Sequence, residues 1–382
     1  MSAARPLGGK VVTLPFIVLS IIAAIGLFFL GERFLFGLGA VANISNGYPW
    51  GIWVVYDVVI GTGFACGGYA LAILIYAANK GHYHPLMRPA LLASLFGYTL
   101  GGFSAFFDMG RWWHAYNIFL PWHINLNSVM LEVGLCVSAY IMVLWIEFSP
   151  TVLEHLKARR HLTLLNRGLF IVIALGMLLP SMHQSSLGSL LIALGHKVSP
   201  LWQTPLLPLL FLLSAVAMGF SIVLFEAALS AWGFRRPSEN HLLAPLSRVM
   251  VWTLSLYLIV RVVDLTVRGA WGPAFAGDLP GNMFWVETLL YAVPIFVLAS
   301  PRRRRASHWL FLAAVSMLLA GAVYRFNAFL IGFNPGPGFH YFPSVPEMMV
   351  SLGLIALEIM GYLVIVKKLP VLHRLEGAKA HA

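Results

Sequence analysis

Long apolar stretches separated by short polar segments run through the whole chain. Stretches of roughly 20 apolar residues are long enough to cross a bilayer as helices. They lie near residues 14–36, 52–78, 89–107, 124–147, 168–187, 206–229, 246–267, 282–300, 308–331 and 346–366. The pattern predicts an all-α polytopic membrane protein with about ten transmembrane helices, forming a single transmembrane domain over residues 1–382.

Composition supports this class. Hydrophobic residues make up 59% of the chain and charged residues only 10%, and the mean hydropathy is +0.82. A soluble globular protein of this length would carry far more charge on its surface. The soluble classes are therefore excluded.

Lysine and arginine are distributed unevenly between the two sides of the predicted membrane domain. The N-terminus, the even-numbered connections and the C-terminus hold 19 of the 25, whereas the odd-numbered connections hold only Arg33, Arg111, Lys197 and Arg268. Positive residues concentrate on the cytoplasmic side of membrane proteins. We therefore expect both termini to be cytoplasmic in a bacterial inner membrane. The net charge of +11 then reflects topology and contact with anionic lipid, and not nucleic-acid binding.

Ionisable residues lie within or at the edge of these apolar stretches, where they are costly and usually functional. Most fall toward the predicted periplasmic side; they include Asp57, Asp108, Glu132, Arg261, Asp264, Glu287 and Arg325. Glu132 is expected about 12 Å into the fourth stretch, and Glu226 near the cytoplasmic boundary. Arg261 and Asp264, three residues apart, could instead neutralise each other on one helix.

The sequence offers few ligands for a bound redox centre. A b-type haem needs two facing histidines, yet of thirteen histidines only His183 falls within a predicted span. Cys66 and Cys136 stand alone, so neither an iron–sulfur cluster nor another metal site is expected. Any redox group must come from a partner or from a diffusible lipid-soluble molecule, and a quinone meets this requirement.

A quinone head needs aromatic walls and groups that exchange protons. Suitable residues gather in the outer connections, and the candidate pocket residues are Trp50, Trp53, Asp57, Asp108, Arg111, His114, His123 and Asn127. For any single tryptophan there, an interfacial anchor is the more common role.

Blocks of sequence resemble a known family. They are PLGGK (6–10), FGLG (36–39), YPWGIW (48–53), GTGFACGG (61–68), HPLMRPALLASLFGY (84–98), LPSMHQSS (179–186), FAGD (275–278) and FNPG (333–336). They resemble the integral membrane subunits of hydrogenase-2 type [NiFe] hydrogenases, the HybB type, often labelled cytochrome b. These belong to the wider NrfD or polysulfide reductase membrane-subunit family.

The resemblance implies two four-helix bundles plus two extra helices. It also implies a haem-free subunit that passes electrons reversibly from a periplasmic iron–sulfur protein to menaquinone. The small and large nickel–iron subunits would perform the hydrogen chemistry, and this chain would contribute the quinone site. By family analogy, Tyr98, Glu132, His183 and Glu226 carry protons.

Two other functions remain open from the sequence. Charges within the membrane are also expected in a secondary ion or solute transporter. An inert membrane anchor could use the same charges to seat a redox partner.

Overall fold

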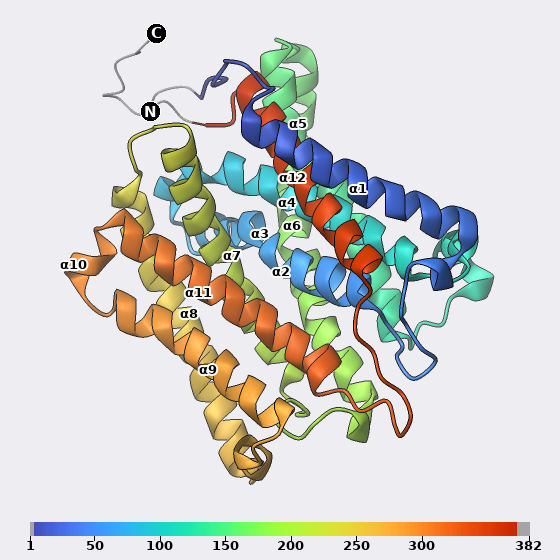
Figure 1. The fold of residues 1–382 in the computed structure, drawn as a ribbon. Coiled ribbons are helices and arrows are strands. Elements are labelled where there is room, and N and C mark those ends of the chain that lie inside the picture. Colours follow the sequence, from blue (N-terminus) through green and yellow to red (C-terminus); the bar gives the residue numbers. More distant parts are fainter. Residues whose placement is uncertain (1–3, 373–382) are drawn as a thin grey trace.

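The computed structural model describes residues 4–372 as helices joined by loops (Figure 1). Within these residues, ten helical segments are long and apolar enough to cross a membrane, which confirms the predicted fold class. They are α1 (Leu14–Phe36), a composite segment Trp53–Ala77, Gly81–Asp108 containing α4 (His84–Asp108), α5 (Val129–His155), α6 (Arg159–Ala193), α7 (Leu207–Gly233), α8 (Asn240–Val267), α9 (Leu279–Leu298), Ser307–Ile331 containing α11 (Ser307–Phe326) and η9 (Asn327–Ile331), and α12 (Val345–Lys368).

The connections distinguish the two ends of the molecule. At one end, which we call the long-loop end, lie residues 37–52, 109–128, 194–206, 268–278 and 332–344. These contain the short helices η1 (Leu38–Ala40), η5 (Trp112–Phe119), η6 (Pro121–His123), η7 (Gly195–Lys197) and η8 (Gly272–Phe275). The opposite end, which we call the basic end, has short connections at 78–83, 156–158, 234–239 and 299–306, with η4 (Gly81–Tyr83) and α10 (Pro301–Arg304).

Several helices have different ends from those that hydropathy predicts. α6 runs from Arg159 to Ala193, well beyond the predicted 168–187, because a helix continues into the interface with polar side chains that a hydropathy window does not count. α5 starts at Val129 and not at 124. Its start is fixed by Ser128, whose hydroxyl accepts a hydrogen bond from the Leu131 amide at 3.3 Å.

The helices form two groups of four and one pair. In the first group the composite second segment contacts α4 and α6, and α5 also contacts both of these helices. In the second group α7 contacts α8 and α11, and α9 also contacts both of these helices. Contacts of α7 with α6 and with the composite segment join the two groups. α1 lies along α12, and this pair covers the first group through contacts of α12 with α4 (Figure 1). This arrangement agrees with the expected pair of bundles plus two helices.

The second segment is irregular and is the most buried of the ten spans within the described residues. It consists of η2 (Trp53–Ile60), α2 (Gly61–Phe64), α3 (Gly67–Ala72) and η3 (Ile73–Ala77), where η2 and η3 have the wide π-type turn. Neighbouring helices approach its backbone at glycines. A Cβ at Gly101 of α4 would lie 2.6 Å from the Asp57 carbonyl oxygen, and one at Gly219 of α7 would lie 2.5 Å from that of Cys66. Small residues thus let both bundles pack directly on this segment.

α1 and α12 also cross at glycines. A Cβ at Gly26 would lie 2.7 Å from the Met349 carbonyl oxygen and 2.8 Å from the Gly353 Cα. The two backbones therefore touch, and no larger side chain fits between them without separating the helices.

We predict that Gly26→Leu destabilises the protein because its side chain would force α1 away from α12. The expected loss is roughly 1–3 kcal/mol, the usual cost of overpacking. Gly31→Leu on the same helix is the matched control, because a Cβ at Gly31 meets nothing within 4 Å. Thermal unfolding of the purified protein in detergent measures both. Equal losses in the two variants would contradict the close crossing.

A buried ion pair holds the second group of helices together. The guanidinium of Arg261 on α8 lies 2.9 Å from Oε1 of Glu287 on α9. Oε2 of Glu287 accepts hydrogen bonds from Trp202 Nε1 at 3.0 Å and from Asn327 Nδ2 at 2.9 Å. The carboxylate is thus bonded from three separate segments, which compensates for its removal from water.

Removing one member of this pair leaves a buried charge without its counter-charge. We predict that Glu287→Gln costs about 3–5 kcal/mol of stability. The control is Glu154→Gln, which breaks the half-exposed Arg88–Glu154 pair at 2.7 Å and should cost about 1 kcal/mol or less. Denaturant unfolding in micelles compares the two, and similar losses would show that burial does not set the strength of the Arg261–Glu287 pair.

Candidate functional site

The carboxylate of Asp108, the last residue of α4, stands at the centre of a polar cluster at the long-loop end. Oδ2 accepts a hydrogen bond from the Gly51 amide at 2.6 Å. Oδ1 is buried and has no hydrogen-bond partner among the described residues. A Cβ at Gly51 would lie 2.8 Å from Oδ1 and 3.3 Å from the Tyr341 hydroxyl, so glycine at this position lets the carboxylate and the phenol approach the same backbone.

Arg33 of α1 fixes the end of α4. The side chain is only 1% exposed. Its Nε donates to the Phe107 carbonyl at 2.7 Å, and Nη2 donates to the Met109 carbonyl. These are among the carbonyls that a helix leaves unpaired at its C-terminus. The guanidinium also interacts electrostatically with Asp108. The sequence marks Arg33 only as one of the few basic residues in the odd-numbered connections, because its partners are backbone groups that no sequence pattern identifies.

Glu347, in the first turn of α12, organises the loops around Asp108. Its carboxylate accepts hydrogen bonds from the Asn43 amide at 3.0 Å, the Tyr341 hydroxyl at 2.8 Å and the Ser344 amide at 2.7 Å. Tyr341 in turn accepts a hydrogen bond from the Ile52 amide at 2.7 Å. Burial, and secondly the neighbouring Glu347, raise the pKa of Tyr341 well above its usual range. The phenol therefore stays protonated and acts as a fixed donor.

Trp50 and Trp53 are interior residues and not interfacial anchors. Trp50 donates from Nε1 to the Phe329 carbonyl at 3.0 Å, and Trp53 donates to the Glu347 carbonyl at 3.1 Å. One turn further along η2, Asp57 accepts a hydrogen bond from the Ser351 hydroxyl at 2.9 Å. The anchor alternative fails for these two tryptophans, because both are buried. The structure thus brings four predicted pocket residues, Trp50, Trp53, Asp57 and Asp108, to one end of the first bundle.

The other four candidates lie apart from this cluster. Arg111, His114, His123 and Asn127 are exposed on the 109–128 connection. Within residues 4–372, their side chains form no hydrogen bond or ion pair with Asp108. Trp122, which is 75% exposed on the same connection, has the setting that an interfacial anchor needs.

Tyr98 and His183 meet in a second polar network between the two bundles. The His183 Nε2 and the Thr62 hydroxyl lie 3.1 Å apart, and Gln184 donates to Thr62 at 3.2 Å and to the Tyr98 hydroxyl at 3.4 Å. Gln184 also accepts a hydrogen bond from Arg325 at 2.7 Å. His183 Nδ1 has no partner in the described part of the chain.

Arg325 is fully buried and is compensated without a carboxylate. Besides Gln184, it donates to the Ser214 hydroxyl at 3.1 Å and contacts the Met218 sulfur at 2.9 Å. Its guanidinium also lies 5.2 Å from the ring centre of Phe211. No acidic side chain of residues 4–372 lies within ion-pair distance of Arg325, so its positive charge acts on the whole network around Tyr98 and His183.

Glu132 and Glu226 do not join this network. Glu132 is exposed in the first turn of α5. It is nearer the helix end than the expected 12 Å of depth, because α5 starts at Val129. Glu226, half-buried on α7 toward the basic end, accepts a hydrogen bond from the Tyr362 hydroxyl of α12. The structure therefore places the four expected proton carriers in three separate locations.

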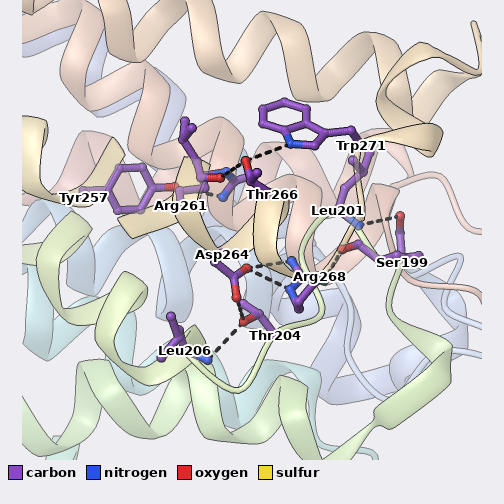
Figure 2. A network of polar contacts seen from close by, with 12 residues as sticks. Ser199, Leu201, Thr204, Leu206, Tyr257, Arg261, Asp264, Thr266, Arg268 and Trp271 are labelled. Atoms are coloured by element: carbon purple, nitrogen blue, oxygen red, sulfur yellow. Dashed lines mark hydrogen bonds and ion pairs between the residues drawn. The ribbon is translucent and has the colours of Figure 1, made fainter. Parts of the chain in front are cut away.

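The expectation that Arg261 and Asp264 neutralise each other is wrong. Asp264 accepts two hydrogen bonds from Arg268, at 3.0 and 2.7 Å, and one from Thr204 at 2.6 Å. Figure 2 shows this cluster beside Arg261, whose guanidinium donates to Tyr257 and pairs with Glu287. Residues three and four apart on a helix are both neighbours, so spacing alone did not decide between the two partners.

The described residues contain no set of ligands for a metal. No group of three His, Cys, Asp or Glu side chains there is placed to hold an ion. Of the histidines in residues 4–372, His183 alone is buried. A b-type haem needs two facing histidines, so these residues do not fit that group.

Comparison with known proteins agrees with the sequence motifs. A family model described as "Polysulphide reductase, NrfD" matches residues 40–334. The chain is 46% identical to the "Probable Ni/Fe-hydrogenase 2 b-type cytochrome subunit" of Escherichia coli (strain K12), over 96% of this chain and 95% of the relative. A protein of Nitratidesulfovibrio vulgaris is 31% identical over 94% of both chains. The integral membrane subunit of menaquinone reductase from that organism is 26% identical over 40% of this chain and 37% of the relative.

The resemblance that the motifs indicated is therefore confirmed. The family model covers most of the chain, and the first of these relatives aligns with it almost from end to end. The chain is a multi-pass membrane protein that belongs to the NrfD polysulphide reductase family.

Proposed function

We propose that this chain is the haem-free, quinone-reactive membrane subunit of a hydrogenase complex. It takes electrons from a periplasmic iron–sulfur subunit, which the nickel–iron subunits reduce, and delivers them reversibly to menaquinone with coupled proton transfer. Two relatives support this assignment, one named as a hydrogenase 2 subunit and one as a membrane subunit of menaquinone reductase.

The observation that carries the proposal is the unused hydrogen-bonding capacity of the Asp108 carboxylate. Within residues 4–372, its Oδ1 is buried and has no hydrogen-bond partner, while Oδ2 accepts a hydrogen bond from the Gly51 amide. A quinol that is oxidised must give its proton to a base within hydrogen-bond reach, and a quinone that is reduced must receive one. Asp108 offers that oxygen in a fixed orientation, and the Tyr341 phenol beside Gly51 supplies a second polar group.

The site also lies close to lipid. Arg33, which holds the end of α4, comes from α1, and the outer face of α1 is exposed along much of its length. One helix thus separates Asp108 from the apolar surface of the protein. A quinone diffuses within the bilayer, so a head-group site beneath a peripheral helix is reached without passage through water.

The orientation that we propose follows from the uneven distribution of basic residues. The basic end faces the cytoplasm, and the long-loop end with Asp108 faces the periplasm. Electrons from a periplasmic partner then arrive on the side where Asp108 lies.

We predict that Asp108→Asn lowers hydrogen-driven reduction of a menaquinone analogue by at least about 10²-fold, the usual contribution of a positioned acid–base group. The amide still accepts the Gly51 hydrogen bond but cannot take up a proton. The assay uses inner-membrane vesicles that contain the hydrogenase and iron–sulfur subunits.

Asp278→Asn is the matched control. Asp278 also lies at the long-loop end and accepts a backbone hydrogen bond, from the Gly281 amide at 2.8 Å, but it is outside the Asp108 cluster. Its variant should keep the rate of the unmodified protein. Vesicles that lack the chain should show no reduction. Full reduction without the chain would refute the proposed function and favour an anchor or a transporter, whereas unchanged activity in Asp108→Asn would refute only the role of Asp108.

A further inference from the structure

Protonatable side chains follow one face of α12 across most of its length. Glu347, Ser351, Glu358 and Tyr362 are separated by four, seven and four residues, spacings that bring side chains to the same side of a helix. The line from Glu347 to Tyr362 is about 22 Å long at a rise of 1.5 Å per residue. It therefore spans most of a hydrocarbon core about 30 Å thick.

Both ends of this line connect to acids on other helices. Toward the long-loop end, Ser351 donates to Asp57 at 2.9 Å, and Glu347 is bonded to Tyr341 at 2.8 Å. Toward the basic end, Tyr362 donates to Glu226 on α7. The line is thus continued by hydrogen bonds at both ends.

Glu358 occupies the middle of the line and differs from the other members in its lack of hydrogen bonds among the described residues. Its carboxylate is half-buried, and no hydrogen bond or ion pair to it occurs within residues 4–372. It faces α4, where a Cβ at Gly97 would lie 3.3 Å from Oε1. Its charge interacts with Asp57 and Tyr56. An acid that stabilises nothing inside a membrane helix is costly to keep, which points to a function.

Glu226 connects the line to the surface. A small pocket at the basic end is lined mostly by apolar side chains, and Glu226, Ser230, Arg236 and Glu239 are its polar members. These polar groups are the partners that a water molecule beside the Glu226 carboxylate would need. The other end of the line lies beside the candidate site, because the Tyr341 hydroxyl and Asp108 approach the same glycine, Gly51.

We infer that protons cross the membrane along this face of α12, between the pocket at Glu226 and the Asp108 site, with Glu358 as the central relay. Each step passes one proton from an acid or hydroxyl oxygen to a neighbouring oxygen, and no electron moves along the line. The rise from Ser351 to Glu358 is about 10 Å, so water molecules bridge the intervals next to Glu358. The inference rests on the proposed function, because the protons taken up at the basic end are those that quinone reduction consumes.

The test uses inverted inner-membrane vesicles containing the complete hydrogenase complex, with the cytoplasmic face outward. Hydrogen is added, and the reduction of a menaquinone analogue is measured together with the rise in pH of the medium. The unmodified complex should consume about one medium proton per electron, since quinone reduction takes up a proton with each electron. In Glu358→Gln this ratio should fall at least tenfold, because the quinone must then take its protons from the vesicle lumen, where oxidation of hydrogen releases them.

Glu147→Gln is the matched control, because Glu147 is also a half-buried acid in a span with an unpartnered oxygen, but it faces Gly176 of α6 and not α12. Its ratio should not change, and Glu358→Asp should restore the ratio lost in Glu358→Gln. If Glu358→Gln does not fold, Tyr362→Phe breaks the link to Glu226 and should lower the ratio in the same way.

Different results separate the two proposals. Unchanged proton uptake in Glu358→Gln overturns the route. So does a ratio near zero in the unmodified complex while the quinone analogue is reduced, and that result leaves electron transfer to the quinone standing. Absence of reduction in the unmodified complex overturns the proposed function itself.

Discussion

A charge inside a bundle of apolar helices must find its partners within the protein, and this requirement determines how the helices of this chain are joined. Arg261 and Glu287 link α8 to α9 and, through Trp202 and Asn327, to two further segments. Arg33 links α1 to the end of α4. Hydrophobic contact alone does not specify which apolar helices should pack together in a lipid environment, so these polar contacts specify the neighbours.

The same requirement separates charged groups that only stabilise the fold from those that are available for proton transfer or ligand binding. Where every oxygen or nitrogen has a partner, as in Glu287, the side chain is fixed and adds rigidity. Asp108 and Glu358 differ, because one has a buried oxygen without a partner and the other is not bonded at all in the described residues. Groups of this kind can bind a proton or a ligand without breaking an existing contact. They are therefore the positions where substitution should change activity more than stability.

Much of the fold could be predicted from the sequence, because an apolar helix of about 20 residues is as long as the hydrocarbon core is thick, and hydropathy detects such stretches directly. The partners of the charges could not be predicted. Asp264 pairs with Arg268, four residues away, and Arg261 pairs with Glu287 on another helix. Such pairings depend on the orientation of each helix about its axis relative to its neighbours, and no pattern within the sequence encodes that orientation. The spacing of Glu347, Ser351, Glu358 and Tyr362 was visible in the sequence, but its meaning required knowing that this face of α12 turns toward other acids.

The charge of Arg325 dominates the electrostatics of the network around Tyr98 and His183. That network lies between the bundles and offers several hydrogen-bonding groups. Arg325 places a positive charge beside it, and no carboxylate of residues 4–372 lies at ion-pair distance to balance that charge. A buried guanidinium opposes the arrival of another cation. Along α12 the neighbouring groups are acids, which favour a proton. The two networks therefore differ in charge: the network around Arg325 joins the bundles at a positive centre, whereas the acids along α12 favour a proton on the route that we infer.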